Sequence, residues 1–385
     1  MADRKTILIL GGGIGGVVTA TRLRKKLPRG HRVVLVERSP NYIFQPSLLW
    51  LMTGIRNAGK ITRPLNQLDK LGVERIQGEV KHIDPQHKTV QVDGREITAD
   101  YLVIALGAEL APDIIPGLAK AGHNFYTLTG AESLRDARLT LREGRIAVLV
   151  SAIPFKCPAA PYEAAMLLEY DCRKRKLREH ITIDLYSPEP GPMPIAGPEV
   201  SKQVRQMVEA KGIGYHPEHA VTRVDPAARR INFANGASTI FNLLAYVPPH
   251  RAPQVVRDAG LTGESGWVPV NRDTLETKFP GIYAIGDVTG IMLSMGKPLP
   301  KAGVFAHAEG EVVANNLIYE LTGKGEPKTF DGHGECFLET GDGKAGFGSG
   351  NFFAEPAPRI KLRNPSRTLH LGKVAFEKYW LFEWF

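Results

Sequence analysis

The chain begins with a short apolar run that leads through glycines into a helical pattern. Residues Thr6–Leu10 are almost continuously apolar, which is typical of a strand buried on both faces of a parallel sheet. The stretch Val17–Lys26 has helical spacing, and a second apolar run, Arg32–Val36, ends at Glu37. This order of strand, helix and strand predicts a βαβ unit at the N-terminus.

Three glycines lie between the first strand and the helix in the order G-x-G-x-x-G. Gly11 allows a tight turn, Gly13 lets a pyrophosphate approach the backbone, and Gly16 permits close packing of helix on strand. The helix N-terminus offers free N–H groups to the phosphates. Glu37, followed by Arg38, stands about 20 residues after the glycines, where a carboxylate accepts hydrogen bonds from ribose hydroxyls. The pattern predicts a dinucleotide site that contains these five residues.

Two later apolar segments end in small residues and help to identify the dinucleotide. Tyr101–Ala108 runs into a turn that contains Gly107, and Thr277–Asp287 ends in Gly286-Asp287. With the first glycines, these segments resemble the sequence marks of glutathione-reductase-like flavoproteins. The resemblance implies FAD, with Asp287 near its ribityl–phosphate region. On pattern alone, an aspartate at this place more often caps a turn or helix.

A second unit of the same kind follows, but its turn is unusual. Arg145–Val150 and Ile181–Tyr186 are predicted strands, and the turn Ser151–Pro161 contains no glycine and three prolines. Prolines stiffen the backbone and remove N–H donors that a pyrophosphate needs. Ser187-Pro188, rather than an acid, follows the second strand. We therefore expect a Rossmann-like fold that no longer binds nicotinamide.

The three cysteines are too few for a disulfide framework, which leaves burial or redox chemistry as their roles. Cys157 lies in the proline-rich turn, beside Lys156 and just before a helical pattern that contains Glu163. A cation and a helix N-terminus both lower a thiol pKa, so we expect a reactive Cys157. A buried, inert thiol is the alternative. Glu163 is a candidate proton carrier, or a carboxylate that merely suits a helix start. We interpret Cys172, in a charged helical stretch, as incidental.

The motif CPAAPYE at Cys157–Glu163, the distant Cys336 and the segment Gly372–Tyr379 together resemble sulfide:quinone oxidoreductase. The resemblance covers essentially the whole chain. It implies that Cys157 and Cys336 form a redox pair and that Glu163 is the acid–base residue. The implied function is FAD-dependent oxidation of sulfide to sulfane sulfur or polysulfide, with electrons passed to membrane quinone.

The same resemblance has further implications for the flavin. It places Lys301 near the pyrimidine end of the ring, where a cation stabilises a reduced, anionic flavin. A surface lysine in a proline-rich loop is the alternative. Leu110–Thr129 lacks the third cysteine that many members carry, and Asn41–Leu49 lacks the cysteine to which flavocytochrome relatives attach the flavin. We therefore expect FAD to be bound without a covalent link.

The C-terminal end is rich in aromatic and basic residues, Lys373 among the latter, and Phe376–Phe385 is too densely aromatic to fit one buried stripe. Rings and flanking cations suit the interface of an anionic membrane. Core packing or a dimer contact is the alternative. The resemblance adds a quinone pocket, with Phe353, Phe376 and Tyr379 as candidate ring contacts. No stretch of about 18 apolar residues occurs and no secretory signal is recognised, so we expect peripheral attachment at the cytoplasmic face.

The net charge of +9 in 385 residues favours an anionic surface or ligand. No nucleic-acid motif and no metal-ligand set is present, so neither nucleic acid nor metal is expected as a partner. Two functions in the same fold stay open: a type II NADH:quinone oxidoreductase and a sulfide dehydrogenase flavoprotein subunit. A non-catalytic sulfide or persulfide sensor is a third alternative, and a homo-oligomer stays open.

The predicted fold is α/β, with two Rossmann-like dinucleotide-binding domains of the glutathione-reductase-like kind and a membrane-associating C-terminal segment. Residues 1–110 and 265–325 are expected to form the FAD domain. Residues 111–264 form the second domain, and residues 326–385 form the C-terminal quinone and membrane-interface segment.

Overall fold

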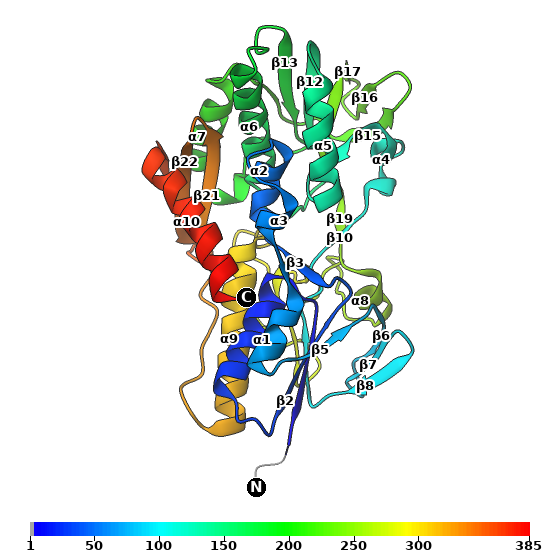
Figure 1. Ribbon diagram of the computed structural model, residues 1–385, viewed down its shortest axis with the longest axis vertical. Coiled ribbons are helices and arrows are strands. Elements are labelled where there is room, and N and C mark those ends of the chain that lie inside the picture. Colours follow the sequence, from blue (N-terminus) through cyan, green and yellow to red (C-terminus); the bar gives the residue numbers. More distant parts are fainter. Residues whose placement is uncertain (1–3) are drawn as a thin grey trace.

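The computed structural model describes residues 4–385 and contains two parallel sheets, one in each lobe of the molecule (Figure 1). The first sheet has the strand order β20-β9-β1-β2-β5. Its strands are β1 (Thr6–Leu10), β2 (Arg32–Glu37), β5 (Glu74–Gln77), β9 (Tyr101–Ile104) and β20 (Ile282–Ala284). Because β20 pairs with β9, the sheet joins segments 180 positions apart, and Ile282 lies opposite Leu102. The expected long strand over Thr277–Asp287 is confined to β20.

Two helices pack closely against each other on one face of the first sheet: α1 (Ile14–Lys26) and α9 (Gly303–Thr322). Their approach depends on glycine, since a Cβ on Gly310 would lie 2.8 Å from the Gly15 carbonyl oxygen. The Thr19 hydroxyl donates to that same carbonyl oxygen at 2.8 Å. On the other face lies an antiparallel sheet of β6 (Val80–Asp84), β7 (Thr89–Val92) and β8 (Arg95–Thr98).

The second lobe repeats this architecture with the strand order β11-β18-β12-β13-β14. The strands are β11 (His123–Asn124), β12 (Gly144–Val150), β13 (Ile181–Tyr186), β14 (Gly214–His216) and β18 (Leu243–Val247). Its long helices are α5 (Leu128–Thr140), α6 (Ala160–Lys174) and α7 (Pro198–Glu209). A small antiparallel sheet contains β15 (Val221–Asp225), β16 (Arg230–Phe233) and β17 (Ser238–Ile240). The β12–α6–β13 unit confirms the predicted second βαβ pattern.

The C-terminal part forms an antiparallel sheet and a long helix: β21 (His333–Gly341), β22 (Lys344–Asn351), β23 (Arg359–Ser366) and α10 (Arg367–Glu383). Strand β21 packs against α6, and α10 packs against β22. In Figure 1, α10 (red) runs along one side of the molecule from the β21–β22 sheet toward α9. The C-terminal part thereby contacts both lobes.

Short elements connect these units: β3 (Asn41–Ile43), α2 (Leu48–Met52), α3 (Ala58–Ile61), β4 (Thr62–Pro64), β10 (Glu109–Leu110), α4 (Leu118–Ala121), β19 (His250–Arg251), α8 (Gln254–Asp258), and 3-10 turns at Gln45–Ser47, Leu65–Leu71, Pro112–Ile114, Pro194–Ala196 and Gly286–Val288. Among residues 4–385, no helix is both long and apolar enough to cross a membrane. The exact domain boundaries given above stay a prediction.

Candidate active site

The glycine loop after β1 has the geometry that a pyrophosphate requires. Gly11 has a φ of +104°, and a Cβ on Gly16 would lie 1.8 Å from the Gly11 carbonyl oxygen. Neither position therefore tolerates a side chain. A Cβ on Gly13 would meet no atom within 4 Å, so its backbone borders open space at the start of α1. This loop fits the close approach of a dinucleotide phosphate.

Glu37 ends β2 beside this loop, where its carboxylate is fixed by two backbone donors. The N–H of Gly12 donates to Oε2 at 2.7 Å, and the N–H of Ser39 donates to Oε1 at 2.9 Å. A carboxylate has about four acceptor positions, so two stay available for ribose hydroxyls. Arg38 is exposed next to it.

The third sequence mark, Gly286-Asp287, follows β20 after one residue, Ile285, and the carboxylate of Asp287 has no hydrogen-bond partner within residues 4–385. The Asp287 carbonyl oxygen accepts a hydrogen bond from Lys301 Nζ at 2.8 Å, as does the Thr289 carbonyl oxygen at 2.8 Å. Lys301 Nζ also lies 3.4 Å from the ring centroid of Trp267. Lys301 is only 7% exposed, so the alternative of a surface lysine is wrong. Burial lowers the pKa of Lys301 to about 8.

A buried glutamate that the sequence did not single out lies in the same region. Glu309 on α9 is fully buried and accepts a hydrogen bond from the Gly286 N–H. Burial raises the pKa of Glu309 to about 8, because no solvent stabilises its charge. The available signal was the position of Glu309 between the small residues Ala308 and Gly310 in the helical stretch VFAHAEGEVVANNL. Gly107, the remaining predicted residue, lies in the turn between β9 and β10.

The turn that carries Cys157 is tied to the loop of Lys301. The Cys157 N–H donates to the Lys301 carbonyl oxygen at 2.7 Å, although the two residues are 144 positions apart. Cys157 itself has a φ of +53°, a left-handed conformation that non-glycine residues adopt rarely. Helix α6 begins three residues later at Ala160, whose N–H donates to the Cys157 carbonyl oxygen. The predicted position near a helix N-terminus is confirmed.

The predicted lowering of the Cys157 pKa is wrong. Burial raises the pKa of this thiol well above its usual range, and the nearby Cys336 and Glu163 raise it further. Lys156, expected to stabilise the thiolate, instead donates a hydrogen bond from Nζ to Gln45 Oε1 at 2.8 Å. At neutral pH the Cys157 thiol is therefore protonated, and thiolate formation requires a proton acceptor.

Cys336 comes from the distant strand β21 and lies within electrostatic reach of Cys157. Its surface is accessible to solvent, and its Sγ lies 3.3 Å from the Phe337 carbonyl oxygen. Protein atoms nevertheless surround the thiol closely, and desolvation together with Glu163 raises the pKa of Cys336 to about 12. Both cysteines are free thiols in this structure. Cys172, in contrast, is buried in the core of the second lobe.

Glu163 joins the two cysteines to the C-terminal helix. Its side chain is 2% exposed, and Oε1 accepts hydrogen bonds from Lys373 Nζ at 2.8 Å and from the Glu339 N–H at 2.8 Å. Burial alone lowers the pKa of Lys373, but the carboxylates of Glu163 and Glu339 outweigh it, and the net pKa is raised. His370, which is partly exposed, shares a 2.8 Å hydrogen bond with Glu339. Lys373 is thus a buried partner of Glu163 and not the membrane-facing cation that the sequence suggested.

The three aromatic residues predicted for a quinone do not form one cluster. Phe376 on α10 lies 6.4 Å from Phe337, the neighbour of Cys336, measured between ring centroids. Tyr379 is exposed on the same helix. Phe353 packs instead against Phe330, with the two ring centroids 5.3 Å apart. Only Phe376 is therefore connected through ring contacts to the strand that carries Cys336.

Together these features fit a bound flavin dinucleotide. The glycine loop offers an uncovered backbone at Gly13, Glu37 keeps free acceptor positions, and the Asp287 carboxylate has no partner within residues 4–385. The cysteine turn and the Lys301 loop meet where the two lobes join, so both thiols lie next to the flavin-binding lobe. Among these residues, no group of His, Cys, Asp or Glu could hold a metal ion.

Comparison with known families agrees with this fold. The model of the family described as pyridine nucleotide-disulphide oxidoreductase matches residues 5–310, and the chain belongs to this family. Within it, the chain is 28% identical to the sulfide-quinone reductase of Aquifex aeolicus, over 98% of this chain and 91% of that protein. It is 26% identical to the mitochondrial sulfide:quinone oxidoreductase of Mus musculus, over 91% of this chain and 79% of that protein.

A solved structure shows the same relationship. The crystal structure of the Aquifex aeolicus sulfide:quinone oxidoreductase superposes with a TM-score of 0.89 at 26% identity, over 99% of this chain and 91% of that one. In sequence, the chain is also similar to the type II NADH:quinone oxidoreductase of Staphylococcus aureus, at a lower identity of 22% over 89% of each chain.

Proposed function

We propose that this protein oxidises sulfide to sulfane sulfur or polysulfide and passes the electrons through non-covalently bound FAD to membrane quinone. The observation that carries this proposal is the meeting of Cys157, Cys336 and Glu163 at the junction of the two lobes. Similarity to sulfide:quinone oxidoreductases along nearly the whole chain supports the assignment of the donor and acceptor.

In the proposed reaction, hydrosulfide attacks one sulfur of an oxidised Cys157–Cys336 pair. A new S–S bond forms, the bond between the two cysteines breaks, one cysteine becomes a persulfide, and the other leaves as a thiolate. The attacking sulfur loses two electrons and the cysteine pair gains them. FAD, when bound, supplies the two-electron acceptor that reoxidises the pair and delivers the electrons to quinone.

Glu163 is the group proposed to move the proton. Because the pKa of both thiols is raised, the leaving thiolate takes up a proton at neutral pH. The Glu163 carboxylate lies within electrostatic reach of both thiols and is held in place by Lys373 and the Glu339 N–H. Lys373 also lies within electrostatic reach of Glu339, whose carboxylate shares a 2.8 Å hydrogen bond with the partly exposed His370.

The proposed flavin contacts follow from the fit described above. Gly11, Gly13 and Gly16 hold the pyrophosphate, Glu37 and Arg38 border the ribose, and Gly107, Gly286 and Asp287 line the remainder. Lys301 is proposed to present its buried positive charge to the pyrimidine end of the ring. A cation that is kept out of water stabilises a developing negative charge strongly.

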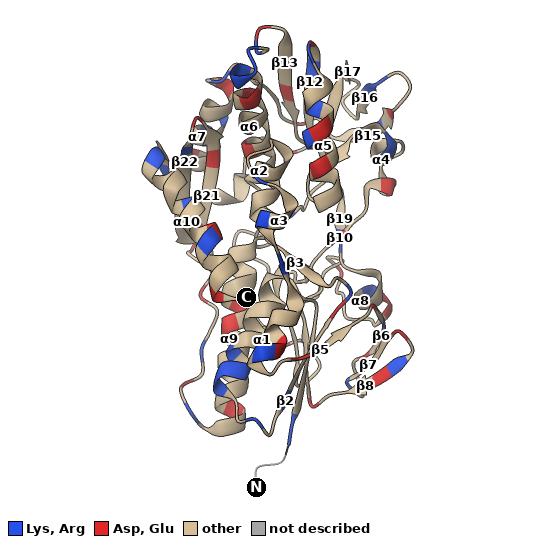
Figure 2. Ribbon diagram, viewed as in Figure 1, with Lys and Arg blue, Asp and Glu red and all other residues tan. Residues whose placement is uncertain are grey.

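The acceptor side of the proposal depends on α10, which we propose to lie on the cytoplasmic face of a membrane. Leu371, Tyr379 and Phe382 are 63%, 59% and 81% exposed, while Lys373 and Glu377 of the same helix point inward and are buried. In Figure 2 most of α10 is tan, but charged positions interrupt it, and its second half contains Glu377, Lys378 and Glu383. An outward apolar face suits the headgroup region of a bilayer. Phe376 is the proposed ring contact for quinone.

The alternative of a type II NADH:quinone oxidoreductase is disfavoured by the turn after β12. This turn contains prolines at positions 154, 158 and 161 and no glycine, so it lacks the backbone donors that a nicotinamide dinucleotide uses. An acid at the end of β13 is also absent, since Ser187 follows this strand.

The proposal is tested by the choice of electron donor in steady-state turnover. Reduction of a soluble quinone is measured with sulfide or NADH, for the wild type and for the variants Cys157→Ser, Cys336→Ser and Cys172→Ser. Sulfide should support turnover in the wild type and in Cys172→Ser, and not in the other two. Faster turnover with NADH would assign the protein to the alternative. Absence of turnover with both donors would favour the alternative of a non-catalytic sulfide or persulfide sensor.

A further inference from the structure

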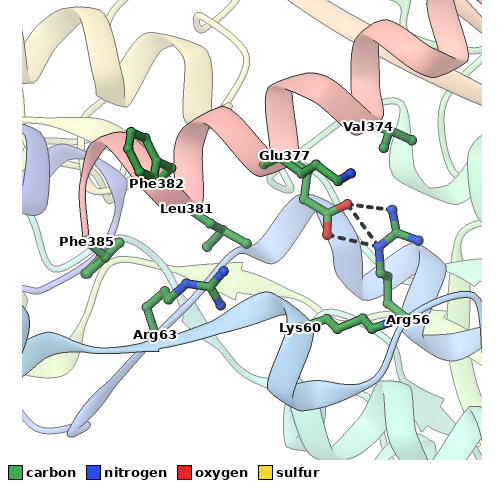
Figure 3. Close-up of a pocket in the computed structure, with 9 residues that line it drawn as sticks. Arg56, Lys60, Arg63, Val374, Glu377, Leu381, Phe382 and Phe385 are labelled. Atoms are coloured by element: carbon green, nitrogen blue, oxygen red, sulfur yellow. Dashed lines mark hydrogen bonds and ion pairs between the residues drawn. The ribbon is translucent and has the colours of Figure 1, made fainter.

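A basic groove separates α10 from the segment that contains α3 and β4. It has a volume of about 630 Å³. Its lining residues are Arg56, Lys60, Arg63, Val374, Glu377, Lys378, Leu381, Phe382 and Phe385. Figure 3 shows Arg56, Lys60 and Arg63 on one wall and the α10 side chains on the other.

The charges of this groove are not balanced. Four of its side chains are cationic and one is a carboxylate, which leaves an excess of three positive charges. The carboxylate, Glu377, uses both oxygens for Arg56, at 3.0 and 3.1 Å from Nε. Arg63 donates only to the carbonyl oxygen of its neighbour Thr62. Within residues 4–385, Lys60, Arg63 and Lys378 have no ion-pair partner. Three uncompensated cations around one groove favour an anionic occupant.

Beyond Glu377 and Lys378, the α10 wall is apolar toward the C-terminal end of the helix and continues into its exposed face. Leu381 and Phe385 line the groove, and Phe382, at 81% exposure, stands at its rim. An occupant that satisfies both walls has an anionic head and an apolar tail. A quinone ring is neutral and leaves the three cations unpaired, and a soluble phosphate leaves the apolar wall in water.

We propose that this groove binds one acidic phospholipid, with its phosphate between Lys60, Arg63 and Lys378 and its acyl chains along Leu381, Phe382 and Phe385. This inference rests on the proposed attachment of α10 to a membrane. It goes beyond that attachment, since it assigns a stoichiometric lipid site instead of a general attraction to an anionic surface. A lipid held in this way links α10 to the segment of residues 56–63 and fixes the helix against the flavin lobe.

The experiment measures binding of monomeric dioctanoyl-phosphatidylglycerol, below its micelle concentration, to the FAD-loaded full chain by calorimetry. One lipid should bind per chain, and dioctanoyl-phosphatidylcholine and inorganic phosphate should bind at least tenfold more weakly. The double variant Lys60→Gln/Arg63→Gln should bind about 25-fold more weakly, because each cation near an anionic lipid contributes about fivefold. The matched variant Lys361→Gln/Arg363→Gln removes two exposed cations of β23 outside the groove and should stay within twofold of the wild type.

Equal losses in the two double variants would overturn the site, because they would show a general charge effect. Equal binding of phosphate would reduce the site to an anion contact, and binding of a short-chain quinone in place of either lipid would assign the groove to quinone. Sulfide-dependent reduction of a soluble quinone is measured in parallel. Absence of this activity in the wild type would contradict the proposed function. The lipid titration does not depend on turnover, so failure of the proposed function and failure of the lipid site are distinguishable.

Discussion

Lys373 on α10 reaches Glu163 on α6 across the protein interior, with Nζ 2.8 Å from Oε1 and both side chains buried. Lys373 Nζ also lies 5.1 Å from the ring centroid of Trp50. The helix that turns Leu371 and Phe382 outward therefore sends its lysine inward, to the carboxylate beside the cysteines. The C-terminal helix is by this contact part of the candidate active site.

Removal of this lysine should destabilise the protein. In Lys373→Met, Glu163 loses its cation and stays buried, and breaking a buried pair in this way costs about 3–5 kcal/mol. Lys373→Met/Glu163→Gln should recover part of this loss, because no uncompensated charge remains. Denaturant unfolding of the flavin-free chain measures both. The exposed Lys378→Met on the same helix should change stability by about 0.5 kcal/mol or less. Equal effects of the two lysine variants would contradict a buried pair.

Glu163→Gln should slow the reaction with sulfide by about 10²- to 10⁴-fold, the range for loss of a positioned acid–base group. The amide keeps the shape of the side chain and cannot move a proton. The control is Glu335→Gln, an exposed glutamate on β21 next to Cys336. Since a structural defect would also slow turnover, the pH profile decides. The acid–base role requires that the profile changes in Glu163→Gln, and an unchanged profile would reject it.

Glu309 should make stability depend on pH. Its pKa is raised by burial from 4.5 to about 8, so the folded chain keeps the proton that the unfolded chain releases. Stability of the flavin-free protein should therefore fall between pH 4.5 and 8, by a few kcal/mol at most. Glu309→Gln should flatten that slope.

The neighbouring Glu311 provides a control of opposite sign. His307, 3.6 Å away, and the hydrogen bonds from Arg22 lower its pKa to about 2, so its contribution is present above pH 4.5 and is lost only as the pH falls toward 2. Glu311→Gln should lower stability at neutral pH and leave the slope between pH 5 and 8 unchanged. A slope that persists in Glu309→Gln would contradict the protonated state of this glutamate.

Two aromatic residues of α10 should separate membrane binding from packing. Phe382 is 81% exposed, and its change to Ala should weaken binding to anionic vesicles about tenfold with little effect on stability. Trp380 is 3% exposed against Trp384 and Phe44, and its change to Ala should cost about 3–5 kcal/mol of stability. Vesicle sedimentation and thermal unfolding measure the two effects. Unchanged sedimentation of Phe382→Ala would contradict the membrane-facing surface.

The βαβ units were predictable from the sequence because buried parallel strands are continuously apolar and the glycine spacing has a steric cause. The structure accordingly places β1, α1 and β2 close to the predicted ranges, with the helix beginning at Ile14 instead of Val17. The strand expected over Thr277–Asp287 shortened to Ile282–Ala284, since only these residues pair with β9.

The C-terminal helix shows why the remainder was not predictable. Its bulky apolar residues do not form a single buried stripe. Trp380, Leu381 and Trp384 pack inward, whereas Phe376, Tyr379 and Phe382 are exposed. Lys373 resembled a surface cation because its partner, Glu163, lies 210 positions earlier. The expected low pKa of Cys157 failed for a related reason, since the sequence showed a nearby lysine and helix start but not the burial that outweighs both.

The central claim is that sulfide delivers its electrons through the Cys157–Cys336 pair. The most direct test follows flavin absorbance anaerobically after mixing the FAD-loaded protein with sulfide or NADH, and then adds a soluble quinone. The account predicts that sulfide alone bleaches the wild-type flavin, that quinone restores its absorbance, and that Cys157→Ser and Cys336→Ser retain FAD without bleaching. Bleaching by NADH, or rapid bleaching by sulfide in both cysteine variants, would contradict it.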